Sequence, residues 1–170
     1  MLTNFDTAYQ DHDHDHCVED ALRLARRVCE QKGQRFTSLR QAVLELVWSC
    51  HKPLGAYEII DLLSQREGRR IMPPTVYRTL DFLVDLGLVH KISSINAFIG
   101  CPFPERRHSH IFLLCRQCSC TVECSTEKLN GPIQQLATDH GFKLEARNIE
   151  LSGLCPRCQE TDPDNNKEPR

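Results

Sequence analysis

Four of the ten cysteines in this 170-residue chain fall within CRQCSCTVEC, residues 115–124, and HSH at 108–110 stands just before them. Thiols at this density point to disulfides, to redox chemistry or to metal ligation. The N-terminal segment MLTNFDTAYQDHDHDH lacks the basic and apolar regions of a secretion signal, so we expect a cytoplasmic protein. Structural disulfides are rare in that reducing compartment, which leaves metal ligation and redox chemistry as the two interpretations.

Two C-x-x-C pairs favour metal ligation. One pair lies in CRQC and the other in GLCPRC, and we expect each at a turn that ends a strand. A two-residue spacer in such a turn lets both sulfurs face one ion at about 2.3 Å, and two pairs complete a tetrahedral zinc site. A thioredoxin-like redox pair needs a single C-x-x-C ahead of a helix within a βαβ pattern, which neither pair shows. We therefore predict a four-thiolate zinc site at Cys115, Cys118, Cys155 and Cys158. The alternative is that the four residues are two pairs of reduced, buried thiols.

A second group of possible ligands brackets the segment 101–107: His90, Cys101, His108 and Glu123. Their nitrogen, sulfur and oxygen donors are compatible with four-coordinate zinc, and the thiolate disfavours iron(II) and manganese. Each residue alone also has an ordinary interpretation, as a strand cap, a core thiol or a solvent-facing acid. The residue types by themselves leave this second site open.

Apolar residues recur at helical spacing in four segments, residues 18–33, 38–50, 56–65 and 73–87. Ser38 with Gln41 three residues later forms a capping-box pattern at the second start. After Gly87 the period changes to two, and LVHKI and AFIGC predict a hairpin around SSIN. Helices followed by a hairpin predict a winged helix-turn-helix. Its fourth helix would enter the DNA major groove and bury a stripe made of Val76, Leu80, Leu83 and Leu86.

Charge supports a DNA-binding interpretation only weakly. The net charge is −2, but residues 18–92 carry 12 bases and 9 acids, a balance of +3. A balance this small is also typical of an ordinary solvated surface. Thr75 and Arg78 lie opposite the apolar stripe near the start of the fourth helix, whereas Asp81 and Asp85 come later, an order that suits docking on phosphates.

The rest of the chain predicts a small α/β module, so the fold class is α+β. HIFLLC and TVEC predict strands around a tight turn, GPIQQLATDHG a helix, and FKLEARNIELSGLC a strand with a possible bulge near Asn148. We place a His/Asp-rich disordered tail at 1–17, a winged-helix DNA-binding domain at 18–100, a hinge at 101–107, a zinc-binding dimerisation domain at 108–160 and a disordered tail at 161–170.

PPTVYRTLDFLVDLGLVHKI, HSHIFLLCRQC and GLCPRC together resemble the ferric-uptake-regulator (Fur) family over about residues 20–160, and most closely its zinc-sensing branch. The resemblance implies a homodimer that binds operator DNA with metal bound and represses metal-uptake genes. It implies structural zinc on the four paired cysteines and operator contacts chiefly by Tyr77 and Arg78. It also implies that the regulatory zinc is held by His90, Cys101, His108 and Glu123.

Several residues depart from the family pattern. Iron-sensing members carry an HHDH-like stretch where this chain has HSH, which favours zinc, and His110 competes with His108 as the ligand. Cys120 and Cys124 match no ligand, so we interpret them as reduced core or strand residues, with thiol-based redox sensing as the alternative. HDHDHC at 12–17 lies outside the family core and is interpreted as an acidic tail rather than a weak metal site.

These residues suggest a mechanism in which one zinc, bound by residues on both sides of the hinge, sets the spacing of two DNA-binding domains. We expect Arg35 and Arg40 to add phosphate contacts. A zinc hydrolase or deaminase would need an open metal position with a nearby general acid, and the signature of nucleobase deaminases is absent. We therefore expect no enzyme activity and no small-molecule substrate. The sequence contains no run of about 18 or more apolar residues, so we expect no membrane span. An iron- or manganese-sensing regulator and a redox-switched regulator of the same family remain the alternatives.

Overall fold

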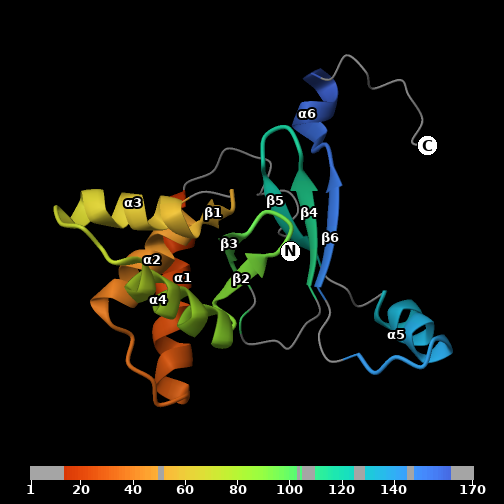
Figure 1. The fold of residues 1–170 in the computed structure, drawn as a ribbon, viewed down its shortest axis with the longest axis horizontal. Helices are drawn as coiled ribbons and strands as arrows, with labels where there is room; N and C mark the ends of the chain where they lie inside the picture. The colour runs from red at the N-terminus through yellow and green to blue at the C-terminus, as the bar shows by residue number, and fades with distance from the viewer. Residues whose placement is uncertain are drawn as a thin grey trace. The chain divides into compact units, whose positions relative to one another are not determined.

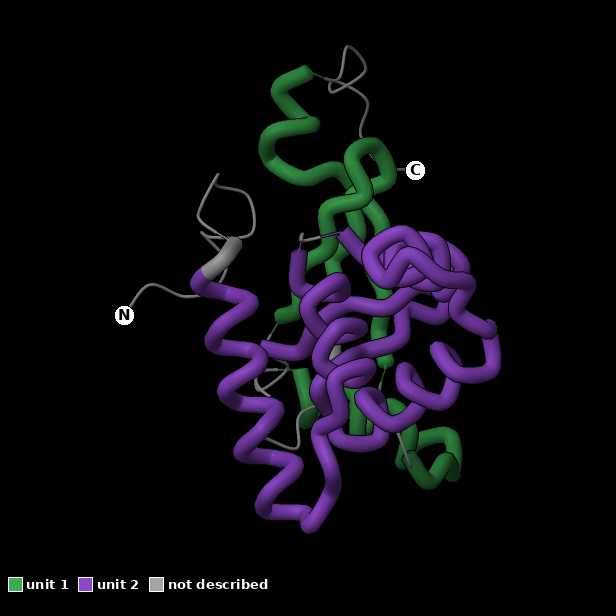
Figure 2. Tube along the Cα trace, turned by 90° about the vertical axis from the view of Figure 1, so that its left-hand side faces the viewer, with its two compact units in different colours: residues 1–11, 107–170 green, residues 12–106 purple. Residues whose placement is uncertain are grey.

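A computed structural model describes residues 14–49, 52–102, 104, 110–124, 129–144 and 148–161, and it divides the chain into two compact units. Unit 2 spans residues 12–106, and unit 1 contains the described residues after residue 107 (Figure 2). Helical and strand elements occur in both units, which confirms the α+β class. None of the helices in the described ranges is long and apolar enough to cross a bilayer. The domain limits proposed from the sequence stay predictions.

Four helices of unit 2 confirm the helical periodicity of the sequence (Figure 1): α1 His14–Gln31, α2 Ser38–Trp48, α3 Ala56–Glu67 and α4 Pro73–Asp85. Two details differ from the predictions. α1 begins at His14, four residues before the helix predicted from residue 18. The N-cap of α2 is Thr37, whose hydroxyl accepts from the Arg40 amide at 3.4 Å, and not Ser38.

Helix α4 forms as its sequence predicts. Two prolines occupy its first turn, where their missing N–H groups cost no hydrogen bond. Gly87, at φ 73°, follows the last turn in a left-handed conformation that glycine adopts without strain. The predicted apolar stripe is confirmed, because all four of its members are buried: Val76, Leu80, Leu83 and Leu86.

The predicted hairpin is confirmed as β2 Val89–Ile92 and β3 Ala97–Gly100. A two-residue strand, β1 Leu54–Gly55, pairs with β3 to give the order β1-β3-β2; its sequence had predicted only a turn, because two residues are too short for a periodic signal. His90 pairs with Ile99, and the Cys101 amide donates to the Leu88 carbonyl at 3.0 Å. This register decides which side chains share a face of the hairpin.

Unit 1 is built on a three-stranded sheet of order β5-β4-β6. β4 His110–Cys115 pairs antiparallel with β5 Thr121–Cys124 and parallel with β6 Asn148–Gly153. Helix α5 Asn130–Asp139 confirms the predicted helix, and α6 Pro156–Thr161 is an addition that the sequence analysis assigned to a turn and a tail.

One predicted strand is too long. The pattern beginning at Phe142 predicts a strand, but residues 142–144 are not in one, and Phe142 is 72% exposed. In the residues that the structure describes, the pairing of β6 begins where Asn148 pairs with His110, the first residue of β4, and residues 142–144 lie before that pair.

Candidate metal centre and DNA-binding surface

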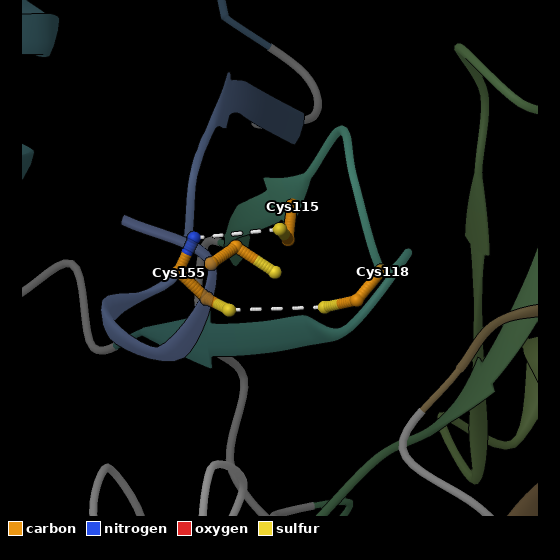
Figure 3. Close-up of side chains that lie close together, drawn as sticks. Cys115, Cys118 and Cys155 are labelled. Atoms are coloured by element: carbon orange, nitrogen blue, oxygen red, sulfur yellow. Dashed lines mark hydrogen bonds between the residues drawn. The ribbon is translucent and has the colours of Figure 1, made fainter. Parts of the chain in front are cut away.

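Four cysteine sulfurs of unit 1 lie within 4.8 Å of one another: those of Cys115, Cys118, Cys155 and Cys158. The sulfurs of Cys118 and Cys155 are 3.7 Å apart (Figure 3). Four thiolates at about 2.3 Å from one tetrahedral ion are about 3.8 Å apart, so the Cys118–Cys155 spacing is that of two ligands of one zinc ion. We call these four residues the cysteine knuckle.

Strand pairing brings the two cysteine pairs together. Cys115 ends β4 and pairs in parallel register with Gly153, two residues before Cys155. The Cys155 amide donates to the Cys115 sulfur at 3.4 Å (Figure 3), a bond that also orients the thiolate. Cys158 lies on α6, whose first turn follows Cys155 directly.

A tight turn positions the first pair. The Cys115 amide donates to the Cys120 carbonyl and the Ser119 amide donates to the Cys115 carbonyl, both at 2.9 Å. Ser119 adopts φ 62°, a left-handed conformation that closes the turn between β4 and β5. The turn therefore confirms the expected strand-end position for Cys115 and Cys118, whereas the second pair lies between a strand and a short helix.

The electrostatics of the knuckle suit a thiolate site. Burial acts to raise the pKa of Cys115, but the backbone N–H groups of Cys118, Cys155 and Gln117 outweigh it and lower this pKa to about 6. Burial and the neighbouring thiols raise the pKa of Cys158 to about 12. One thiolate thus forms readily, and its negative charge disfavours a second thiolate beside it. A divalent cation bound between the sulfurs would remove this repulsion.

Two further thiols lie outside this set of four. Cys120 is half-buried and packs against the knuckle; burial and then the charges of Cys118 and Cys155 raise its pKa to about 11. Burial and the adjacent Glu123 raise the pKa of Cys124. Raised pKa values oppose thiolate reactivity, which agrees with reading both as reduced structural residues.

The structure describes three of the four residues predicted to hold a regulatory metal: His90, Cys101 and Glu123. A ring nitrogen of His90 and the sulfur of Cys101 lie within 4.8 Å in unit 2, because Cys101 pairs with Leu88 and so shares a face with His90. Cys101 is buried and His90 half-buried. Glu123 is half-buried on β5 in unit 1. His108 lies outside the described residues, as does the side chain of its competitor His110.

Three predicted DNA contacts lie together on the exposed side of α4. Thr75 and Arg78 are exposed, and Tyr77 is exposed by 36% although it is large and aromatic. All three belong to the first two turns, where the positive end of the helix dipole also attracts phosphate. Asp81 and Asp85 are exposed later along the helix, as the sequence predicted.

The two other predicted DNA contacts differ from each other. Arg35 is exposed. Arg40 is half-buried: its guanidinium stacks over the Phe82 ring of α4 at 3.2 Å from the centroid and donates to the Arg35 carbonyl. Arg40 therefore anchors the start of α2 to α4. Sequence analysis missed Tyr57, which is 70% exposed near the start of α3; a lone aromatic in a helical pattern carries no signal that it faces solvent.

The winged-helix order of unit 2 and the thiol cluster of unit 1 define a class of winged-helix proteins that carry a metal-binding module. The model of the ferric uptake regulator family matches residues 31–152. The chain belongs to the ferric uptake regulator family.

Known proteins of this family are similar along most of the chain. The zinc uptake regulation protein of Escherichia coli (strain K12) is 35% identical over 146 residues, which are 85% of this chain and 85% of that protein. A zinc uptake regulator complexed with zinc and DNA superposes with a TM-score of 0.79 at 34% identity, over 85% of this chain and 96% of that one. The holo XcZur crystal structure gives a TM-score of 0.73 at 39% identity, over 82% and 96%.

Removing one knuckle ligand should empty the knuckle. A four-thiolate zinc site contributes about 10–16 kcal/mol, or about 3 kcal/mol per ligand, so we expect Cys158→Ser to weaken zinc binding there roughly 100-fold. Metal content after dialysis against a chelator, with the melting temperature, measures the effect. Cys124→Ser is the matched control, because Cys124 lies outside the knuckle, and it should retain the metal. Equal metal retention by the two variants would contradict the assignment.

Zinc uptake by the metal-free knuckle should depend on pH through Cys115. At pH 7, above its pKa of about 6, this thiol has already lost its proton, so we expect fewer than four protons released per zinc. At pH 5, below that pKa, Cys115 must also deprotonate, and the release should rise by about one proton. Zinc titration in weakly buffered solution with an indicator dye measures this count. Identical release at both pH values would show that Cys115 is not the first thiolate.

Proposed function

We propose that this chain is a zinc-responsive transcriptional repressor that binds operator DNA as a zinc-loaded homodimer and represses zinc-uptake genes. The observation that supports it most is the His90–Cys101 pair, which lies in the same unit as the exposed DNA-facing side of α4. Family membership and the similarity to zinc uptake regulation proteins support the same conclusion. A protein that acts on chromosomal genes in this way works in the cytoplasm.

The regulatory zinc is proposed to take His90 and Cys101 from unit 2, and His108 and Glu123 from the chain beyond residue 106. When bound, the ion supplies a four-coordinate link across residues 101–107. Cys101 contributes a buried thiolate, a soft ligand that favours zinc over iron(II) or manganese, and this is the reason to rank the iron and manganese alternatives below zinc. The knuckle is proposed as the structural site, because its four thiolates leave no open coordination position.

The DNA-reading role is proposed for α4. Arg78 has the fork of donors that suits the O6 and N7 atoms of guanine, and Tyr77 and Thr75 beside it are exposed for base or phosphate contacts. Arg35 precedes α2 and is exposed, which suits a phosphate contact. One guanidinium nitrogen of Arg40 already donates to the Arg35 carbonyl. Arg40 is therefore proposed to contact phosphate with its other N–H groups.

The homodimer is proposed to form through unit 1. α5 buries only Ala137, and large apolar side chains beside it are exposed: Leu136 by 63% and Phe142 by 72%. On the sheet, Leu151 of the edge strand β6 is 50% exposed. Exposed large apolar side chains are typical of a surface that a second copy covers.

Zinc and DNA affinity are linked in this proposal. An ion that fixes the spacing of two DNA-binding units strengthens operator binding, and operator binding strengthens zinc binding by the same factor. A coupling of about 1–3 kcal/mol, or roughly 5- to 150-fold, is typical of such systems.

The first test is a zinc titration of the purified protein in buffered free zinc, with operator DNA binding followed in parallel. We expect one zinc per chain to resist chelation and a second to increase DNA affinity, whereas Cys101→Ser keeps the first zinc and loses the increase. Cys17→Ser is the matched control, since Cys17 belongs to neither proposed ligand set. Iron(II) or manganese acting at lower concentration than zinc would favour the alternative sensors, and an unfolded Cys101→Ser would contradict separate roles for the two sites.

A charge on the exposed apolar surface of unit 1 should dissociate the dimer. We expect Leu136→Asp to raise the dimer dissociation constant at least about 10-fold, because a carboxylate is costly to bury without a partner. Analytical ultracentrifugation across protein concentration measures this. Gln135→Asp places the same charge on the neighbouring α5 residue and serves as control. A dimer unaffected by Leu136→Asp would mean that another surface joins the copies.

A further inference from the structure

Gly100 is the last residue of β3, and it has no room for a side chain. A Cβ built there would overlap the Trp48 indole at Cε2, Nε1 and Cδ1. Trp48 is the last residue of α2, is half-buried, and packs against the helical core of unit 2. It is also the only tryptophan in the chain. The indole therefore occupies the volume in which any other residue at position 100 would place its side chain.

This contact lies behind the proposed metal ligands. Gly100 pairs with Val89, and both share a hairpin face with Phe98; Val89 and Phe98 are buried in the helical core. Side chains alternate along a strand, so Cys101 and its diagonal neighbour His90 lie on the opposite face. Trp48 thus supports the backbone at the residue that precedes Cys101, from the side away from the metal.

We propose that Trp48 is a positioning residue for the regulatory metal: its indole, seated directly on the Gly100 backbone, holds the end of β3 so that the Cys101 thiolate stays within binding range of His90. The inference rests on the proposed function, since it concerns the regulatory site. The hydrogen bond from the Cys101 amide to the Leu88 carbonyl holds this strand end to the neighbouring strand, within the plane of the sheet. The indole holds it from above one face of the sheet.

A metal ion requires precise placement of its ligands. Zinc–ligand distances vary by only about 0.2 Å, so a strand end free to shift away from β2 costs affinity even when both ligands are intact. The residue before Cys101 is Gly100, which has no side chain to pack into the core, so only its backbone contacts the indole. Residues that orient ligands without touching the ion typically contribute 10- to 100-fold to metal affinity.

A size-swap experiment tests the contact through the zinc affinity of the second site, measured by titration of the full-length protein with its knuckle zinc in place. We expect Trp48→Ala to lower this affinity about 10-fold. Gly100→Val alone should also lower it, because its side chain displaces the indole. In the double variant the valine fills part of the space that the indole leaves, so its affinity should exceed that of either single variant.

Leu63→Ala is the matched control for general loss of stability. Leu63 is fully buried on α3, in the same helical core, and belongs to no proposed binding site. We expect it to lower the melting temperature like Trp48→Ala but to leave the affinity of the second zinc unchanged. Trp48→Phe serves if Trp48→Ala fails to fold, since it keeps an aromatic ring but loses the pyrrole edge that lies on Gly100.

The single tryptophan adds a second readout. Filling of the regulatory site should change the emission of Trp48 in the wild-type protein, and zinc should not change it in Cys101→Ser, which keeps the knuckle zinc. Unchanged second-site affinity in Trp48→Ala, or in Trp48→Phe, would overturn the inference while leaving the proposed function intact. A wild-type protein that takes up only the knuckle zinc would overturn the proposed function and this inference with it.

Discussion

The alternation of side chains along the β2–β3 hairpin is the constraint on which unit 2 depends. One face of the hairpin must be apolar to close the helical core, and Val89 and Phe98 supply it. His90 and Cys101 lie on the other face, which also carries the buried Leu88, Ile92 and Ile99. A shift of one residue in the pairing of one strand would turn its side chains to the opposite face and separate His90 from Cys101. The register that closes the helical core therefore also brings these two side chains together.

Unit 1 depends on a different constraint. Its sheet has three strands, and few side chains are buried among its described residues: apolar residues such as Phe112 and Val122, together with the cysteine knuckle. A unit of this size buries too little apolar surface to be very stable by packing alone, and a four-thiolate metal site is the usual addition. In the knuckle, cysteines at the end of β4 and in the segment after β6 lie together, so the two strands of the parallel pair are also in contact where the pairing ends.

Helix α2 connects the two functional regions of unit 2. It contacts α1, α3, α4 and β3. At its start, Arg40 stacks on Phe82 of the proposed DNA-reading helix, and at its end, Trp48 lies on Gly100 beside Cys101. The proposed DNA-reading helix and the strand end that precedes Cys101 are therefore positioned against the same helix. This arrangement gives a physical basis for a proposed DNA-binding surface whose orientation is fixed relative to His90 and Cys101 within one unit.

Much of this protein could be predicted from the sequence, because its signals are local. Helical periodicity located four helices, the change to period two located the hairpin, and the spacing of two C-x-x-C pairs indicated which four sulfurs would meet. Tertiary structure decided what depends on distant partners. β1 forms because β3 lies beside it, the described pairing of β6 begins at Asn148 rather than at Phe142, and the Arg40 guanidinium stacks on the Phe82 ring. Gly100 reads as a weak strand residue in the sequence, and only the packing of Trp48 from another element shows why a larger side chain has no space there.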